Sequence, residues 1–92
     1  MEEFPYIESG FINLEILDLS NNKIKIIPES IDSLQSLIVL WLNNNPIISL
    51  PETILDLHSL IDFYIINTPI ALNKEKSKIL ENLEAKGVNI WK

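Results

Sequence analysis

The chain has 92 residues, of which 13 are acidic and seven are basic, giving a net charge of −6. This length allows one domain. The chain has no cysteine and one histidine, His58, which argues against disulfide frameworks, thiolate metal sites and histidine clusters. The acidic balance disfavours nucleic acid and anionic membrane surfaces as partners.

The N-terminal residues do not predict a targeting segment. Residues 1–5 are acidic, and no basic stretch followed by an apolar one is present, so we predict no secretory signal. No apolar run reaches about 18 residues, the length that indicates a membrane span. These features favour a chain without a membrane span that resides in the cytoplasm.

The first segment, residues 4–13, matches a later part of the chain. Phe4-Pro5 lies 23 residues before Ile27-Pro28, and Phe11 lies 23 residues before Leu34. We therefore predict that this segment is the second half of a repeat unit whose strand is missing. It either covers the first strand or remains from a longer array.

Three segments that follow, residues 14–24, 37–47 and 60–70, repeat one apolar pattern at an offset of 23. In each copy two apolar residues are separated by one residue, and this spacing of two is the period of a short strand with one buried face. One such strand cannot bury its apolar side alone, so we expect the copies to stack as parallel strands. The residues predicted to point inward are Leu17, Leu19, Leu40, Leu42, Phe63 and Ile65.

Short helical arcs are predicted between the strands. Pro28 and Pro51 begin these arcs, where a missing amide donor is tolerated. The arcs are expected to point four apolar side chains inward. These are Ile31, Leu34, Ile54 and Leu57.

Asparagines stand where the chain leaves each of the first two strands. The amides of Asn22 and Asn45 can bond backbone groups that would otherwise be buried without a partner. Thr68 takes this position in the third copy, and its hydroxyl can satisfy fewer groups. Asn44, beside Asn45, is expected to face solvent, so its loss should be nearly neutral.

The repeat pattern changes after residue 72. Asn73 is a suitable N-cap for a helix over residues 74–86, and Gly87 is typical of the end of a helix. A terminal helix with a polar outer face would cap the stack. Residues 88–90 then alternate like a fourth strand, which we expect to pair parallel to residues 62–66.

The complete unit reads L-x-x-L-x-L-x-x-N-x-I-x-x-L-P-x-x-I-x-x-L-x-x. Over residues 4 to about 72 it closely resembles the leucine-rich repeat family, in its 23-residue form. The resemblance implies an α/β solenoid, a right-handed horseshoe segment with parallel strands on its concave face, helical arcs on its convex face and a C-terminal capping helix. Residues 1–92 then form one domain, with a partial repeat at 4–13, full repeats at 14–36 and 37–59, a third repeat at 60–72, and the cap helix and last strand at 73–92.

Residues that alternate with the buried ones should line the concave face. Trp41 and Tyr64 lie 23 residues apart, so we place them in one column on neighbouring strands, flanked by Asp18 and Asn89, with Trp91 in the same fourth row. An exposed aromatic patch rimmed by carboxylates is typical of an interaction surface. The alternative is that the two rings stack only to stabilise the sheet. The predicted partner-binding residues are Ile16, Asp18, Val39, Trp41, Asn43, Asp62, Tyr64 and Ile66.

The resemblance implies a protein-interaction module, a scaffold rather than an enzyme, with no cofactor and a protein partner. Asp18 and Asp62 could support acid–base chemistry, but nothing in the pattern supplies a pocket, and His58 is expected on the surface. Two alternatives stay open. The chain could self-associate, through the edge strand at residues 16–19 or through the concave face, or it could be the C-terminal fragment of a larger array.

Overall fold

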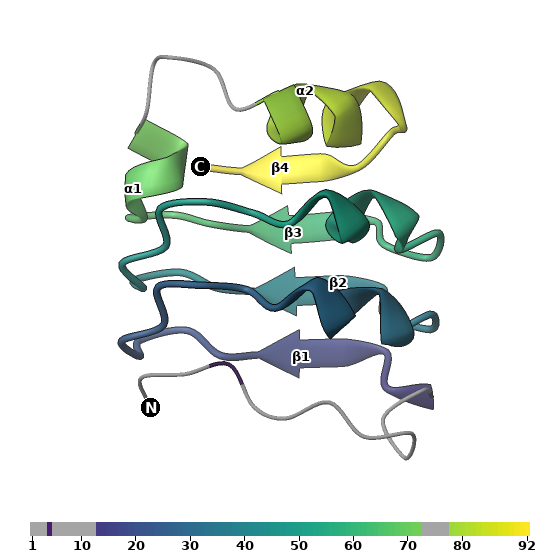
Figure 1. The fold of residues 1–92 in the computed structure, drawn as a ribbon, viewed down its shortest axis with the longest axis horizontal. Helices are drawn as coiled ribbons and strands as arrows, with labels where there is room; N and C mark the ends of the chain where they lie inside the picture. Colours follow the sequence, from purple (N-terminus) through teal and green to yellow (C-terminus); the bar gives the residue numbers. More distant parts are fainter. Residues whose placement is uncertain (1–3, 5–12, 73–77) are drawn as a thin grey trace.

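The computed structural model describes residues 4, 13–72 and 78–92. Within these ranges the sheet has four parallel strands, arranged in chain order and each paired with the next (Figure 1). This arrangement confirms the parallel stacking predicted from the repeat, including the fourth strand. The strands are β1 (Ile16–Asp18), β2 (Val39–Trp41), β3 (Asp62–Tyr64) and β4 (Asn89–Trp91).

The two helical arcs are short 3₁₀ helices, η2 (Glu29–Ser33) and η3 (Glu52–Asp56). Pro28 and Pro51 precede them in extended conformation, with ψ of 153° and 148°, so each proline is the capping residue and not the first helical residue. Each proline carbonyl accepts the first hydrogen bond of its arc, from the amide three residues later, at 3.1 Å.

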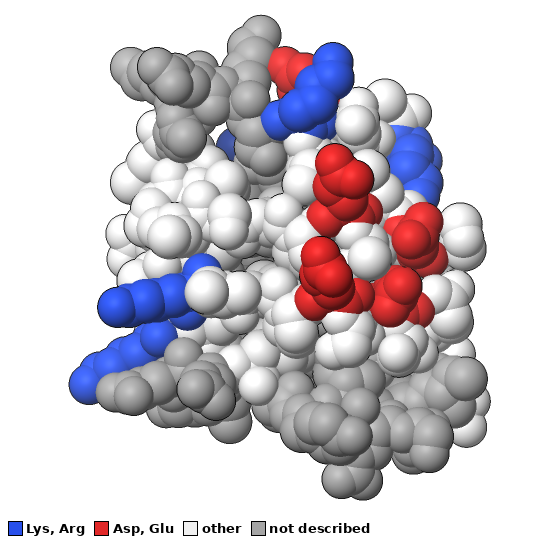
Figure 2. Space-filling model, in the orientation of Figure 1, with Lys and Arg blue, Asp and Glu red and all other residues white. Residues whose placement is uncertain are grey.

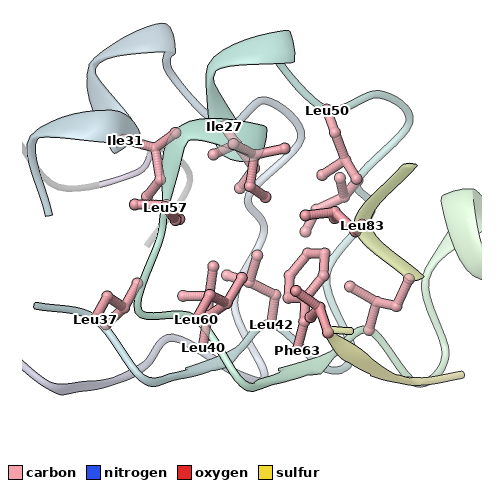
Figure 3. Close-up of a cluster of buried hydrophobic side chains, with 14 of the residues drawn as sticks. Ile27, Ile31, Leu37, Leu40, Leu42, Leu50, Leu57, Leu60, Phe63 and Leu83 are labelled. Atoms are coloured by element: carbon pink, nitrogen blue, oxygen red, sulfur yellow. The ribbon is translucent and has the colours of Figure 1, made fainter. Parts of the chain in front are cut away.

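The hydrophobic core lies between the sheet and the two arcs (Figure 3). The inward positions of β2 and β3, Leu40 and Phe63, are fully buried, as are Ile31 and Ile54 of the arcs. Burying such a side chain stabilises the fold by about 1.5–3 kcal/mol. Leu17 of β1 is only partly buried, because among the described strands it has a neighbour on one side only.

The third repeat departs from the predicted pattern after Thr68. A helical turn, α1 (Pro69–Leu72), forms at the residues that correspond to the non-helical connection 46–49 of the second repeat. The Thr68 hydroxyl donates to the Ile65 carbonyl oxygen at 2.7 Å and accepts from the Ala71 amide at 3.3 Å. The hydroxyl thus bonds a backbone carbonyl at the end of the strand and also caps the helical turn that follows. The asparagines at this position in the earlier copies cap no such turn.

The C-terminal helix α2 (Lys78–Ala85) covers the end of the core with Leu80 and Leu83, and it packs against β4 and η3. Residues 73–77, where the sequence predicts the start of this helix, lie outside the described residues. The helix ends at Ala85, one residue before the predicted end at residue 86. Gly87 has φ +94°, and the amides of Gly87 and Val88 donate to the carbonyl oxygens of Glu84 and Leu83 at 3.0 and 3.1 Å, which is the hydrogen-bond pair of a Schellman motif.

The predicted partial repeat at residues 4–13 lies almost wholly outside the described residues. Phe4 is partly buried and packs against the core, which is compatible with an apolar anchor at this position.

Candidate functional site

The eight predicted site residues all lie on the solvent side of the sheet or of the strand exits. Ile16, Asp18 and Ile66 are exposed, and the others are half-buried. The residues between them, such as Leu40 and Leu42, are fully buried. Strand alternation therefore predicted the side of the sheet correctly for every one of these positions. The half-buried members are Val39, Trp41, Asn43, Asp62 and Tyr64.

An aromatic stack runs across the middle of this face. Asp18, Trp41, Tyr64 and Trp91 occupy matching positions on β1, β2, β3 and β4. The rings of Trp41 and Tyr64 are stacked with centroids 3.8 Å apart and an interplanar angle of 2°. Tyr64 and Trp91 continue the stack at 5.7 Å and 13°. The predicted pairing of the first two rings is thus extended by a third.

The prediction that Asn89 continues this column is wrong. Asn89 pairs with Asp62, and it is Trp91 that pairs with Tyr64. The earlier strands follow one another at 23 residues, but β3 and β4 are 27 residues apart in sequence. The segment that contains α2 is longer than an arc, and this extra length changes the residue that enters the column.

A second column beside the stack contains Ile16, Val39, Asp62 and Asn89. One oxygen of Asp62, Oδ1, accepts from Asn89 Nδ2 and from Trp91 Nε1, both at 3.2 Å. Asp62 therefore links the two columns, and it orients the indole of Trp91 through neutral donors.

Asp18 has a simpler environment. Its side chain is exposed, and its Oδ1 accepts a hydrogen bond from the Ser20 amide at 3.0 Å. None of the lysines in residues 13–72 and 78–92 forms an ion pair with Asp18 or Asp62. The four strands contain these two carboxylates and no basic residue, so the concave face has unbalanced negative charge.

The family model described as Leucine Rich repeats (2 copies) matches residues 12–83, well over half of the chain. The chain belongs to the leucine-rich repeat family. Domains of this family are in general protein-interaction modules, and their repeats are typically not enzymatic. No curated protein matches the chain.

Asn45 is the buried ladder residue of the second leucine-rich repeat, as predicted. Its Nδ2 donates to the carbonyl oxygens of Leu19 and Leu42 at 2.9 and 3.1 Å, and its Oδ1 accepts from the Ile24 amide at 3.1 Å. Among the residues that the structure describes, Asn22 bonds only its own repeat, donating to the carbonyl oxygens of Leu19 and Ser20. The side chain of Asn45 thus links two repeats, whereas the bonds of Asn22 lie within one repeat.

A second asparagine ladder was not predicted. Asn21, Asn44 and Asn67 are exposed and have φ near +60°. Their side chains form a chain of hydrogen bonds from repeat to repeat. Asn44 Nδ2 donates to Asn21 Oδ1 at 2.7 Å, and Asn67 Nδ2 donates to Asn44 Oδ1 at 2.8 Å. Asn44 is exposed, as expected, but its side chain also makes these two hydrogen bonds and its backbone has a positive φ, so its near-neutral loss no longer follows from exposure alone. The signal was an asparagine recurring every 23 residues at a turn, where this residue type tolerates a left-handed backbone.

Asn43 has a structural bond as well as a place on the predicted binding surface. Its Oδ1 accepts from the Ile66 amide at 2.7 Å, so part of its polar side chain is already occupied. His58 is exposed, as expected.

The described residues contain no group of three or more histidine, cysteine, aspartate or glutamate side chains that could hold a metal ion. None of their helices combines the length and apolar character required to cross a bilayer. A shallow cavity of about 340 Å³ lies at the outer edge of β4, lined by Glu84, Gly87, Val88, Asn89, Ile90 and Trp91.

Proposed function

We propose that this leucine-rich repeat domain binds a protein partner through the concave face, centred on Trp41 and Tyr64. The observation that carries the proposal is the stack of three aromatic rings on the solvent side of the sheet. Tryptophan and tyrosine are the residue types most enriched among binding hot spots.

The stack is suited to binding because its rings are already held in place. Each ring is fixed by a neighbour, and Trp91 is also held by its hydrogen bond to Asp62. A partner that packs against these ring edges orders few new side-chain rotamers, which lowers the entropic cost of association.

The surroundings of the stack support the same conclusion. Ile16 and Ile66, on either side of it, are 61% and 44% exposed. Stacking accounts for the position of the three rings, since such pairs stabilise a fold by about 0.5–1.5 kcal/mol. Ile16 and Ile66 extend the apolar surface around the rings, and a contiguous apolar patch is typical of an interaction surface.

The test is a pull-down with the purified wild type, with Trp41→Ala and with Ile48→Ala. Ile48 is a matched control, because it is an exposed apolar residue that lies between β2 and η3 and outside the sheet. We expect a protein that is retained by the wild type and by Ile48→Ala but not by Trp41→Ala. Equal retention by all three would contradict the proposal.

Self-association is measured separately, by light scattering over a concentration series. A dimer in the wild type that is absent in Trp41→Ala would make a second copy of the chain the partner of this face. Dimers in both would place self-association elsewhere, with β1, which is a terminal strand of the described sheet, as the first surface to examine.

A further inference from the structure

We propose that the partner contributes an arginine side chain that lies on the free face of the Trp41 indole and binds the Asp18 carboxylate. The inference rests on the function proposed above and specifies the chemistry of the partner. It combines two features of the described residues at the same end of the stack, an aromatic face on which no other ring lies and a carboxylate without an ion pair.

The uncovered face follows from the register of the strands. Tyr64 covers one side of the Trp41 ring at 3.8 Å. The opposite side faces β1, where the residue in register is Asp18. Neighbouring strands are about 4.8 Å apart, and the aspartate side chain is much shorter than the indole. The outer part of the ring therefore projects past Asp18, and among the residues that the structure describes no ring other than Tyr64 stacks on Trp41.

The charge of this end is unbalanced. Asp18 is exposed and accepts one hydrogen bond, from the Ser20 amide, and it has no ion pair with a described lysine. A cation on the outer face of Trp41 would gain both the attraction of the ring and a charge-assisted hydrogen bond to Asp18.

Arginine fits this geometry better than lysine. The planar guanidinium can lie flat on the indole as a further layer of the stack, while its edge N–H groups reach the carboxylate below. All seven basic residues of the chain are lysines. A second copy of these 92 residues therefore cannot supply the arginine.

The opposite end of the stack does not offer the same site. Two carboxylates lie near Trp91. Asp62 Oδ1 already accepts hydrogen bonds from Trp91 Nε1 and Asn89 Nδ2, and Glu84 lines the shallow cavity there. Glu84 already has a cationic partner in the chain, since Lys92 Nζ lies 3.9 Å from its Oε1. Trp91 therefore provides an internal comparison for Trp41.

The test is an NMR titration of the full chain with the blocked pentapeptide Gly-Ser-Arg-Ser-Gly and with the same peptide containing citrulline, which keeps the planar shape but has no charge. We expect the arginine peptide to shift the Trp41 Nε1–H and Ser20 amide signals saturably, with an affinity on the order of millimolar for one such contact. The Trp91 Nε1–H signal should move less.

The variants make the assignment specific. Asp18→Asn preserves the shape of the side chain and should weaken binding of the arginine peptide by about three- to tenfold. Asp56→Asn, which removes an exposed carboxylate on η3, should leave binding unchanged. Trp41→Ala should abolish the saturable shift of the Ser20 amide.

Three results would overturn the inference: equal binding of the arginine and citrulline peptides, equal binding by Asp18→Asn and the wild type, or equally tight binding of a lysine peptide. None of these results would refute the proposed function, which fails only if Trp41→Ala retains the partner protein. The two proposals can therefore fail independently.

Discussion

At the scale of single residues, the asparagines show how polar side chains hold successive repeats together. Asn45 is 2% exposed and bonds backbone groups of the repeat before it as well as its own. Asn44, beside it, is exposed but occupies a left-handed backbone conformation with φ of 60°. The two neighbours are thus required for different physical reasons, one for hydrogen bonds and one mainly for its backbone.

Asn45→Ala should lower the free energy of unfolding by about 1–3 kcal/mol, because it leaves buried backbone groups without partners. The control is Asn22→Ala, which removes bonds within one repeat only and should cost less. Urea unfolding followed by circular dichroism measures both. Equal shifts of the two midpoints would mean that bonds between repeats add nothing.

Asn44→Ala should destabilise the chain by about 1 kcal/mol more than Asn44→Gly does. Both variants lose the bonds to Asn21 and Asn67, but glycine adopts a positive φ without steric cost. The same urea measurement compares them. If alanine is tolerated as well as glycine, the left-handed backbone is not what selects asparagine here.

At the scale of elements, the repeat made most of the fold predictable. The apolar residue found 23 positions after an inward leucine or isoleucine packs into the core in the same way, so one pattern predicts the strands and the arcs. The helical turn α1 was not predictable in this way, because Thr68 replaces asparagine and caps a turn instead of bridging repeats.

The site was predictable to the same extent. Alternation along a strand decides which side chains face solvent, and this placed Trp41, Tyr64 and Asp62 correctly. It could not show that Trp91 joins the stack, because the register of β4 depends on the length of the segment that contains α2. Stacking distances and the bond from Trp91 to Asp62 are likewise properties of the folded sheet.

Deleting residues 73–92 should abolish cooperative folding. The deletion removes Leu80, Leu83 and Val88 from the core cluster that contains Phe63, and each buried apolar side chain contributes about 1.5–3 kcal/mol to a total of about 5–15 kcal/mol. The truncated chain should aggregate or lose its circular dichroism signal. A soluble truncation that melts cooperatively would contradict a capping role for this segment.

A point variant checks the same role without a deletion. Leu83 is 1% exposed, so Leu83→Ala should cost about 2–5 kcal/mol. Leu72 is 71% exposed, and Leu72→Ala should stay within about 0.5 kcal/mol. Thermal or urea unfolding of the pair would show whether α2 supports the core.

At the scale of the whole molecule, negative charge is present on both sides of the sheet. The convex side has an acidic patch over η2 and η3 (Figure 2), made by Glu29, Asp32, Glu52 and Asp56. The concave strands contribute Asp18 and Asp62 without a basic residue. Together with the net charge of −6, this distribution should attract cationic partners and repel other copies of the chain.

Binding of the arginine peptide should therefore weaken as salt is added. Exposed charges are screened over about 10 Å at 0.1 M salt and about 3 Å at 1 M, so raising the sodium chloride concentration across this range should lower the affinity several-fold. The titration described above, repeated at two salt concentrations, measures the change. An affinity independent of salt would mean that Asp18 takes no part in binding.

The central claim is that the concave face around Trp41 is the binding surface. The most direct measurement is the dissociation constant of the captured partner for the wild type, for Trp41→Ala and for Ile48→Ala, each first shown to be folded by circular dichroism. If Trp41 is a hot spot, Trp41→Ala should lose at least about 2 kcal/mol of binding free energy, close to thirtyfold in affinity, while Ile48→Ala binds like the wild type. A folded Trp41→Ala variant that binds the partner as tightly as the wild type does would contradict the claim.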